Sequence, residues 1–136
     1  MAENLKSSNL MVWINMSKIF LKSDSGIKIE FVLYEKQAPK TVKAILLVLP
    51  IKKEFVQARF AGEEIWSPKP LKIKLQKENF SRNLLPGEIG FAPFVKSNKV
   101  AGAIALVYGE AKLSDNVNVF GKISKNIYRI SEIIKG

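Results

Sequence analysis

The segment FVLYEKQAPKTVKAILLVLP, residues 31–50, changes from a strand pattern to a helix pattern at one short join. Before the join, every second residue from Ile27 to Leu33 is apolar, which is typical of a strand with one buried face. After Pro39, which suits the first turn of a helix because its missing N–H has no partner there, the apolar spacing becomes helical up to Pro50. That helical face consists of Val42, Ile45, Leu46 and Leu49. The segment therefore predicts a strand that runs directly into a helix.

Strand patterns occupy most of the remaining chain. Residues 18–33 predict a hairpin with its turn at residues 24–26, and residues 54–60 and 63–68 predict two further strands. The segment LKIKL, residues 71–75, alternates apolar residues with lysines, as expected of a strand with one wet face. Residues 76–88 predict a loop that ends in a turn at Pro86 and Gly87. Three more strands follow, at residues 89–91, 101–109 and 116–123.

A second helix is predicted at the C-terminal end. Ser124 would cap it, and its apolar face would consist of Ile127, Ile130 and Ile134. The chain then has about seven or eight strands and two helices, at the strand spacing typical of barrels and sandwiches. We expect a mainly β fold, a closed antiparallel barrel of about eight strands with one helix over each open end.

The length of 136 residues and the hydrophobic content of 47% fit one domain with a substantial core. We expect this domain to span residues 17–136, with residues 1–16 forming either a tail or an extra strand; a true start at Met16 is an alternative. The apolar run at residues 10–14 is too short for a signal peptide or a membrane span. We therefore expect a cytoplasmic protein without a membrane partner, either a monomer or a homodimer.

The composition excludes several classes of chemistry. The chain has no cysteine and no histidine, which removes disulfides, zinc sites of the Cys/His kind, thiol nucleophiles and imidazole bases. We predict no metal and no cofactor. The formal charge of +10 comes almost entirely from lysines, since Arg59, Arg82 and Arg129 are the only arginines. Because nucleic-acid recognition favours the arginine fork, this composition favours a solvated lysine surface over a nucleic-acid site.

Three tracts, in the same order along the chain, resemble the cyclophilin family. IEFVLYEKQAPKTVKAIL is similar to the cyclophilin opening, in which a strand and a polar turn lead to APKT or VPKT at the start of the first helix. PGEIGFAP is similar to the family's Gly-x-Leu-Ser-Met-Ala strand, and NVNVFGKISKN to its HVVFGKVVEG tract. The likeness covers about residues 18–135 and is nearest to the minimal cyclophilin-like family of bacteria and archaea, which has no agreed function. It implies a cyclophilin-like barrel.

The tracts that carry isomerase activity in cyclophilins are not matched. The family's Phe-His-Arg tract and Phe-Met-x-Gln-Gly-Gly strand have no counterpart between residues 54 and 75, where the only arginine is Arg59. Aligned on the shared Phe-Gly, Lys112 stands in place of the family's tryptophan and Val117 in place of its histidine. Residues 103–107, which correspond to the strand with the pocket phenylalanine, contain no phenylalanine. We therefore assign no catalytic residue.

Six residues are candidates for a ligand-binding cleft. Arg59 would be the polar anchor, unless it is a surface residue paired with a nearby glutamate. Four aromatic residues could form apolar walls: Phe60, Trp66, Phe91 and Phe94. Residues such as Trp66, Phe91 and Phe94 more often belong simply to the core. Asn118 could orient a polar ligand, or it could bond a neighbouring loop. The adjacent Glu63 and Glu64 would point to opposite faces of a strand and are interpreted as solvated turn residues.

These observations favour a protein that binds a small molecule or a peptide in a partly apolar cleft, without the usual isomerase active site. The alternative is a weak peptidyl-prolyl isomerase that uses Arg59 to stabilise the twisted amide, since that reaction needs an apolar proline pocket and a hydrogen-bond donor but no nucleophile. A third class is lysine-driven nucleic-acid binding, whose affinity would fall steeply with salt.

Overall fold

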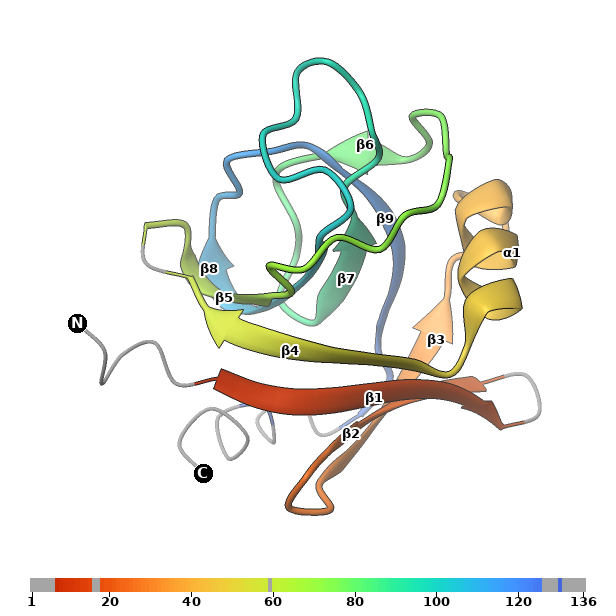
Figure 1. Cartoon of the computed structure of the whole chain (residues 1–136), viewed down its shortest axis with the longest axis vertical. Helices are drawn as coiled ribbons and strands as arrows, with labels where there is room; N and C mark the ends of the chain where they lie inside the picture. Colours follow the sequence, from red (N-terminus) through yellow and green to blue (C-terminus); the bar gives the residue numbers. More distant parts are fainter. Residues whose placement is uncertain (1–6, 16–17, 59, 126–129, 131–136) are drawn as a thin grey trace.

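A computed structural model describes residues 7–15, 18–58, 60–125 and 130. Within these residues there are nine strands and one helix (Figure 1). In chain order they are β1 (Ser7–Asn15), β2 (Lys18–Ser23), β3 (Lys28–Leu33), α1 (Pro39–Val48), β4 (Ile51–Gln57), β5 (Gly62–Trp66), β6 (Phe80–Ser81), β7 (Glu88–Phe91), β8 (Ile104–Ala111) and β9 (Val117–Ile123).

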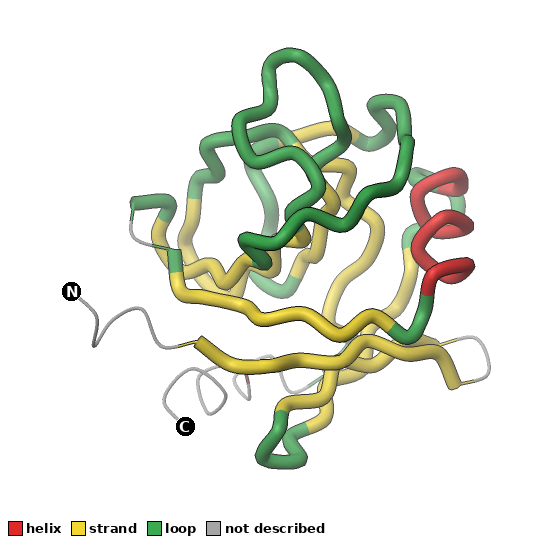
Figure 2. Tube along the Cα trace, viewed as in Figure 1, coloured by secondary structure: helices red, strands yellow, loops and turns green. Residues whose placement is uncertain are grey.

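The strands form one antiparallel sheet that curls into a half-barrel (Figure 2). Their order is β3-β2-β1-β4-β5-β8-β7-β9-β6, and β9 also pairs with β3 over three residue pairs. The predicted mainly β, antiparallel class is confirmed. The predicted closed barrel is wrong: β4 and β5 share only two residue pairs and β9 meets β3 over only three, so the sheet is curled without being a uniformly paired cylinder. The expected tail or extra strand contains β1, which lies between β2 and β4.

The predicted join between strand and helix is confirmed. Pro39 opens α1, and the helix packs the side chains of Val42 and Ile45 into the core. Its first turn is capped from a distant loop, because the Glu78 carboxylate accepts hydrogen bonds from the backbone N–H of Thr41 at 2.7 Å and of Lys40 at 3.1 Å. The helix predicted near the C-terminus falls mostly on residues 126–129 and 131–136, which lie outside the described residues.

The segment LKIKL is not a strand, contrary to its alternating pattern. Leu71, Ile73 and Leu75 do pack against the core, and the intervening lysines are exposed. The backbone has no strand partner among the described segments, and the Leu71 N–H donates instead to the Gly102 carbonyl at 2.9 Å. The alternation therefore predicted which side chains are buried but not the pairing of the backbone.

Apolar residues form two clusters on opposite faces of the sheet. The main core lies on the inner face, under α1, and its largest members are Phe31, Phe55, Phe91 and Phe120. Burial of each such side chain contributes about 1.5–3 kcal/mol. The outer cluster lies on the opposite face of β7, β8 and β9 and consists of Leu84, Ala92, Ala103, Ala105, Val107, Leu113, Val117 and Val119.

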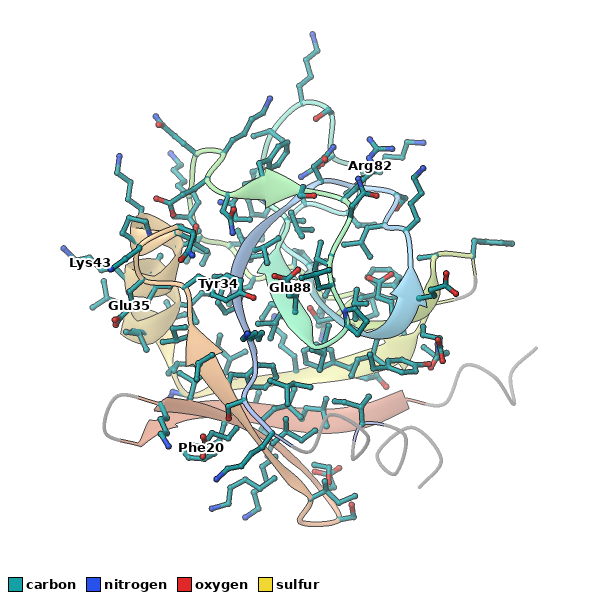
Figure 3. All side chains as sticks on the ribbon, turned by 180° about the vertical axis from the view of Figure 1, so that it is seen from behind. Phe20, Tyr34, Glu35, Lys43, Arg82 and Glu88 are labelled. Carbon is teal, nitrogen blue, oxygen red and sulfur yellow. The ribbon has the colours of Figure 1, made fainter. Side chains whose placement is uncertain are left out.

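Tyr34, just after β3, connects to β7 on the other side of β9 (Figure 3). Its hydroxyl donates to Oε2 of Glu88 at 2.7 Å, while Oε1 of Glu88 accepts from the Leu85 N–H at 2.7 Å. Burial and the neighbouring carboxylate raise the pKa of Tyr34. Because both groups are hydrogen-bonded, this pair holds the two strand ends together.

Among the described residues, no helix is long and apolar enough to cross a membrane. The cytoplasmic location stays a prediction.

Candidate functional site

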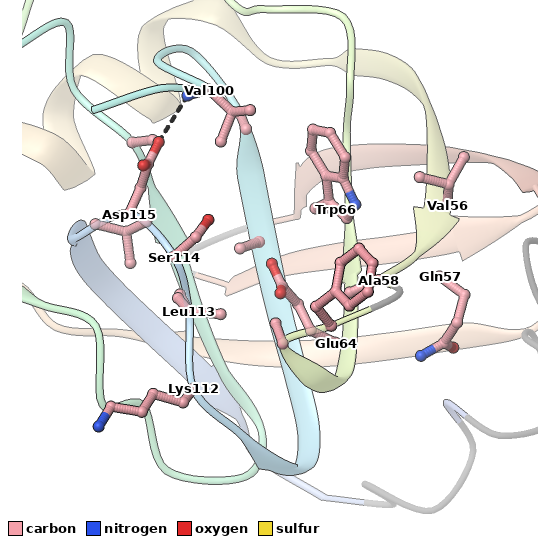
Figure 4. A pocket seen from close by; sticks show the side chains of 16 residues that line it. Val56, Gln57, Ala58, Glu64, Trp66, Val100, Lys112, Leu113, Ser114 and Asp115 are labelled. Carbon is pink, nitrogen blue, oxygen red and sulfur yellow. Dashed lines mark hydrogen bonds between the residues drawn. The ribbon is translucent and has the colours of Figure 1, made fainter. Parts of the chain in front are cut away.

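A pocket of about 520 Å³ lies on the outer face of the sheet, beside the outer cluster (Figure 4). Its walls come from β4, β5, β8, the start of β9 and the segment 112–116. The lining is mostly apolar; in Figure 4, Trp66 and Val56 stand on one side and Leu113 on the other, and Val117 also lines the pocket. A volume of this size is typical of sites that bind small molecules.

The pocket is hollow because small side chains lie on its side of the chain at the start of β8 and just before it. Side chains alternate along a strand, so Ile104 and Leu106 enter the main core while Ala103 and Ala105 face outward. Ala92 adds a third small residue to the pocket lining. The three alanines leave space that larger side chains would fill.

Glu64 projects from β5 into this space. Glu64 pairs with Val107 of β8 and Trp66 pairs with Ala105, so all four side chains leave the same face of the sheet. Glu64 is only 7% exposed, and no described residue donates a hydrogen bond to its carboxylate. Figure 4 shows the carboxylate directed into the pocket, between Trp66 and Leu113. The residue as a whole is buried, but its carboxylate oxygens remain open to the pocket. A carboxylate with a raised pKa and no protein donor marks a candidate binding site.

The environment of Glu64 disfavours its charged form. Burial, and secondarily the negative charge of Asp115, raise the pKa of Glu64 from 4.5 to about 7. Asp115 lies across the pocket, where its two carboxylate oxygens accept hydrogen bonds from the Lys99 N–H at 3.0 Å and the Val100 N–H at 2.7 Å. Asp115 is therefore held by the backbone, whereas Glu64 keeps its hydrogen-bonding capacity for the pocket.

The rim of the pocket mixes polar and aromatic side chains. Gln57 is held in place, since its amide oxygen accepts from the Tyr108 hydroxyl at 2.7 Å and its amide nitrogen donates to the Gly62 carbonyl at 3.3 Å. Lys112 and Ser114 are exposed. In Figure 4 the amino group of Lys112 points away from Glu64. These residues limit the opening without supplying a partner for Glu64.

The six sequence candidates are not brought together. Phe60 and Trp66 line the pocket, with Phe60 almost fully exposed at the rim. Phe91 belongs to the main core on the other face of the sheet, and Phe94 lies against Gly102 outside the pocket. Arg59 lies outside the described residues.

Asn118 has a structural role, which was the alternative left open for it. Its amide oxygen accepts from the Glu78 N–H at 3.1 Å. Its amide nitrogen donates to the hydroxyl of Thr41 at 3.2 Å and to the carbonyl of Gln76 at 2.9 Å. The side chain thus fixes the loop that caps α1 and does not line the pocket.

Two acidic residues of the pocket were missed from the sequence. Glu64 was interpreted as a solvated turn residue, but the expectation that Glu63 and Glu64 point to opposite faces is correct: Glu63 is exposed and Glu64 is buried. The signal that could have found the pocket is the small-residue face of AGAIALV together with a strand in which Glu64 is followed by the apolar residues Ile65 and Trp66. Asp115 carried no comparable signal.

No group of three or more acidic, histidine or cysteine side chains in the described segments is arranged to hold a metal ion. Glu64 and Asp115 are the only carboxylates among the described lining residues. What the pocket offers is one unpartnered carboxyl group in apolar surroundings.

None of the curated proteins matches this chain. A family model described as protein of unknown function (DUF3830) matches residues 21–133, a range that runs from within β2 to beyond β9 and includes every described residue of the pocket. The chain belongs to this family.

Proposed function

We propose that this protein binds a small, largely apolar molecule, or one side chain of a peptide, in the pocket on the outer face of the sheet. The observation that carries the proposal is Glu64, a largely buried residue whose carboxyl group is directed into the pocket and has no hydrogen-bond donor among the described residues. A ligand with a hydrogen-bond donor would bond to this carboxyl group. The floor of the pocket, formed by Ala92, Ala103 and Ala105, would receive the ligand's apolar part.

The lining supports binding better than catalysis. Acid–base chemistry by a pair of carboxyl groups would need Asp115 to exchange a proton with the substrate, but each of its oxygens is already held by a backbone N–H group, which favours its ionised form. Glu64 therefore acts as an anchor for the ligand.

We also propose that the curled sheet is a variant of the cyclophilin-like barrel. The support is the order of elements, with a helix directly after β3, together with the three tracts described above. An experimental structure whose strands follow a different path from that of a cyclophilin barrel would contradict this relationship.

A pocket-filling substitution tests the binding proposal. Ala105→Met would place a flexible side chain into the cavity, and Ala44→Met on α1 is the matched control, because Ala44 does not line the pocket. A metabolite panel is screened by thermal shift against the wild type and both variants. We expect at least one compound to raise the Tm of the wild type and of the control but not of Ala105→Met. A panel that shifts none of the proteins, or shifts all three equally, would contradict the proposal.

A further inference from the structure

The charges of the described residues that line the pocket are mainly negative, although the whole chain is strongly basic with a formal charge of +10. The charged residues among the described lining are Glu64 from β5, and Lys112 and Asp115 from the segment that follows β8; the described lining of β4 has none. Lys112 is exposed and directed away from Glu64 (Figure 4). Among the described lining residues, the charges directed into the pocket are therefore acidic, in a chain whose net charge is basic.

The two carboxylates differ in what they offer a ligand. Each oxygen of Asp115 already accepts a backbone N–H, so this residue contributes charge. Glu64 contributes charge and free acceptor positions, since an ionised carboxylate accepts hydrogen bonds and donates none. An anionic ligand would be repelled by both groups, whereas a cationic donor would be attracted by both.

Aromatic side chains in the pocket also favour a cationic ligand. Trp66 stands beside Glu64 in the pocket (Figure 4). Phe60 also lines the pocket and is almost fully exposed. Aromatic faces attract cations, tryptophan most strongly, and the effect grows when the cation leaves water. The apolar floor of Ala92, Ala103 and Ala105 would exclude water from the rest of the ligand.

From this arrangement we infer that the ligand is an organic cation, a protonated amine on an apolar body, with its ammonium group against Glu64 and its body on the alanine floor. This inference rests on the proposed function, because it names the class of molecule that the pocket would take. The long-range field of the chain does not favour such a ligand, so selectivity must come from contacts within the pocket.

Binding of a cation would be coupled to loss of a proton. With a pKa of about 7, Glu64 is mostly protonated at pH 6 and mostly ionised at pH 8. A cation prefers the ionised form, so its apparent affinity should rise about tenfold between these two pH values, and binding near pH 6 should release a proton. A ligand that accepts a hydrogen bond from protonated Glu64 would show the opposite trend.

Three probes of the same shape test the inference. 2-Phenylethylamine is a cation, 2-phenylethanol is its neutral counterpart and phenylacetate is an anion. Binding is followed by NMR shifts of the lining residues at pH 6 and pH 8 in the wild type, Glu64→Gln and Glu63→Gln. Glu63→Gln is the matched control, because it removes one negative charge from the exposed face of the same strand. NMR spectra of the free variants show whether they are folded.

We expect the wild type and Glu63→Gln to bind the amine at least tenfold more tightly than the alcohol at pH 8, and Glu64→Gln to lose this preference. If the alcohol or phenylacetate binds as well as the amine, the inference is overturned while the proposed function stands. If none of the three probes shifts the NMR signals of the lining residues, both the inference and the proposed function are overturned. A preference for the amine that survives in Glu64→Gln would overturn the inference as well.

Discussion

Replacement of Glu64 by glutamine should stabilise the protein, and the gain should depend on pH. Glu64 has its pKa raised from 4.5 to about 7 by burial and by Asp115, so the folded chain holds this proton to a higher pH than the unfolded chain does. The stabilisation of the folded chain by this bound proton is fully present below pH 4.5 and is lost as the pH rises through 7. Glutamine does not titrate and has no such loss.

The size of this change in stability follows from the pKa shift of Glu64. A change from 4.5 to about 7, at about 1.36 kcal/mol for each pKa unit, corresponds to roughly 3 kcal/mol. The free energy of unfolding of Glu64→Gln, relative to the wild type, should therefore increase by roughly 3 kcal/mol between pH 4.5 and pH 8. This is a large fraction of the stability of an ordinary domain.

Urea denaturation at a series of pH values, followed by tryptophan fluorescence, measures this difference. Glu63→Gln is again the control: Glu63 is exposed, and its Oε1 accepts the Glu110 N–H at 3.0 Å, a bond that the glutamine oxygen can keep. We expect the control to stay within about 0.5 kcal/mol of the wild type at each pH. A constant offset for Glu64→Gln across the pH range would refute the reasoning, and so would an equal pH-dependent gain in the control.

Three further predictions concern the scaffold and the alternative activity. In chemical denaturation, Gly102→Ala should lower the free energy of unfolding by more than Gly26→Ala, for which we expect a loss of roughly 1–2 kcal/mol. Both glycines have positive φ, but only at Gly102 would a Cβ collide with another residue, 2.5 Å from the Pro70 Cβ. Equal losses in the two variants would contradict this. Glu78→Ala should cost about 1 kcal/mol at pH 7. Burial alone would raise the pKa of Glu78, but the hydrogen bonds from Thr41 and Lys40 outweigh it and lower the pKa. The loss of unfolding free energy caused by Glu78→Ala should therefore shrink as the pH falls below 4.5. A loss that persists in acid would contradict the capping role of Glu78. Exchange NMR on an Ala-Pro peptide should show no line broadening from added protein, and broadening would favour the isomerase alternative.

Local patterns were enough to predict most of the secondary structure. The change of apolar spacing at Pro39 located α1, and the hairpin of β2 and β3 followed from alternation and a glycine turn. Such signals depend on neighbouring residues only. Where pairing depends on distant segments, the prediction failed: Leu71, Ile73 and Leu75 alternate like a strand but find a loop carbonyl in place of a partner strand.

The candidate site could be predicted only in part for the same reason. Trp66 and Phe60 line the pocket, whereas Phe91 lies on the inner face of the sheet. Alternation alone cannot say which face of a strand will become the core. Burial of Glu64 depends on β8 and on the segment 112–116, about fifty residues further along the chain. From the local sequence alone, the side chain of Glu64 could face either the solvent or a buried pocket. Only the folded segment 112–116 decides between the two.

The most direct test of the account is a titration of the Glu64 side-chain carboxyl carbon by NMR, with the signal identified by its absence in Glu64→Gln. We predict a midpoint near pH 7 in the free protein, and a lower midpoint when 2-phenylethylamine is present, because a bound cation stabilises the ionised form. A midpoint near 4.5 that the amine does not move would contradict both the buried carboxyl group and its role in binding.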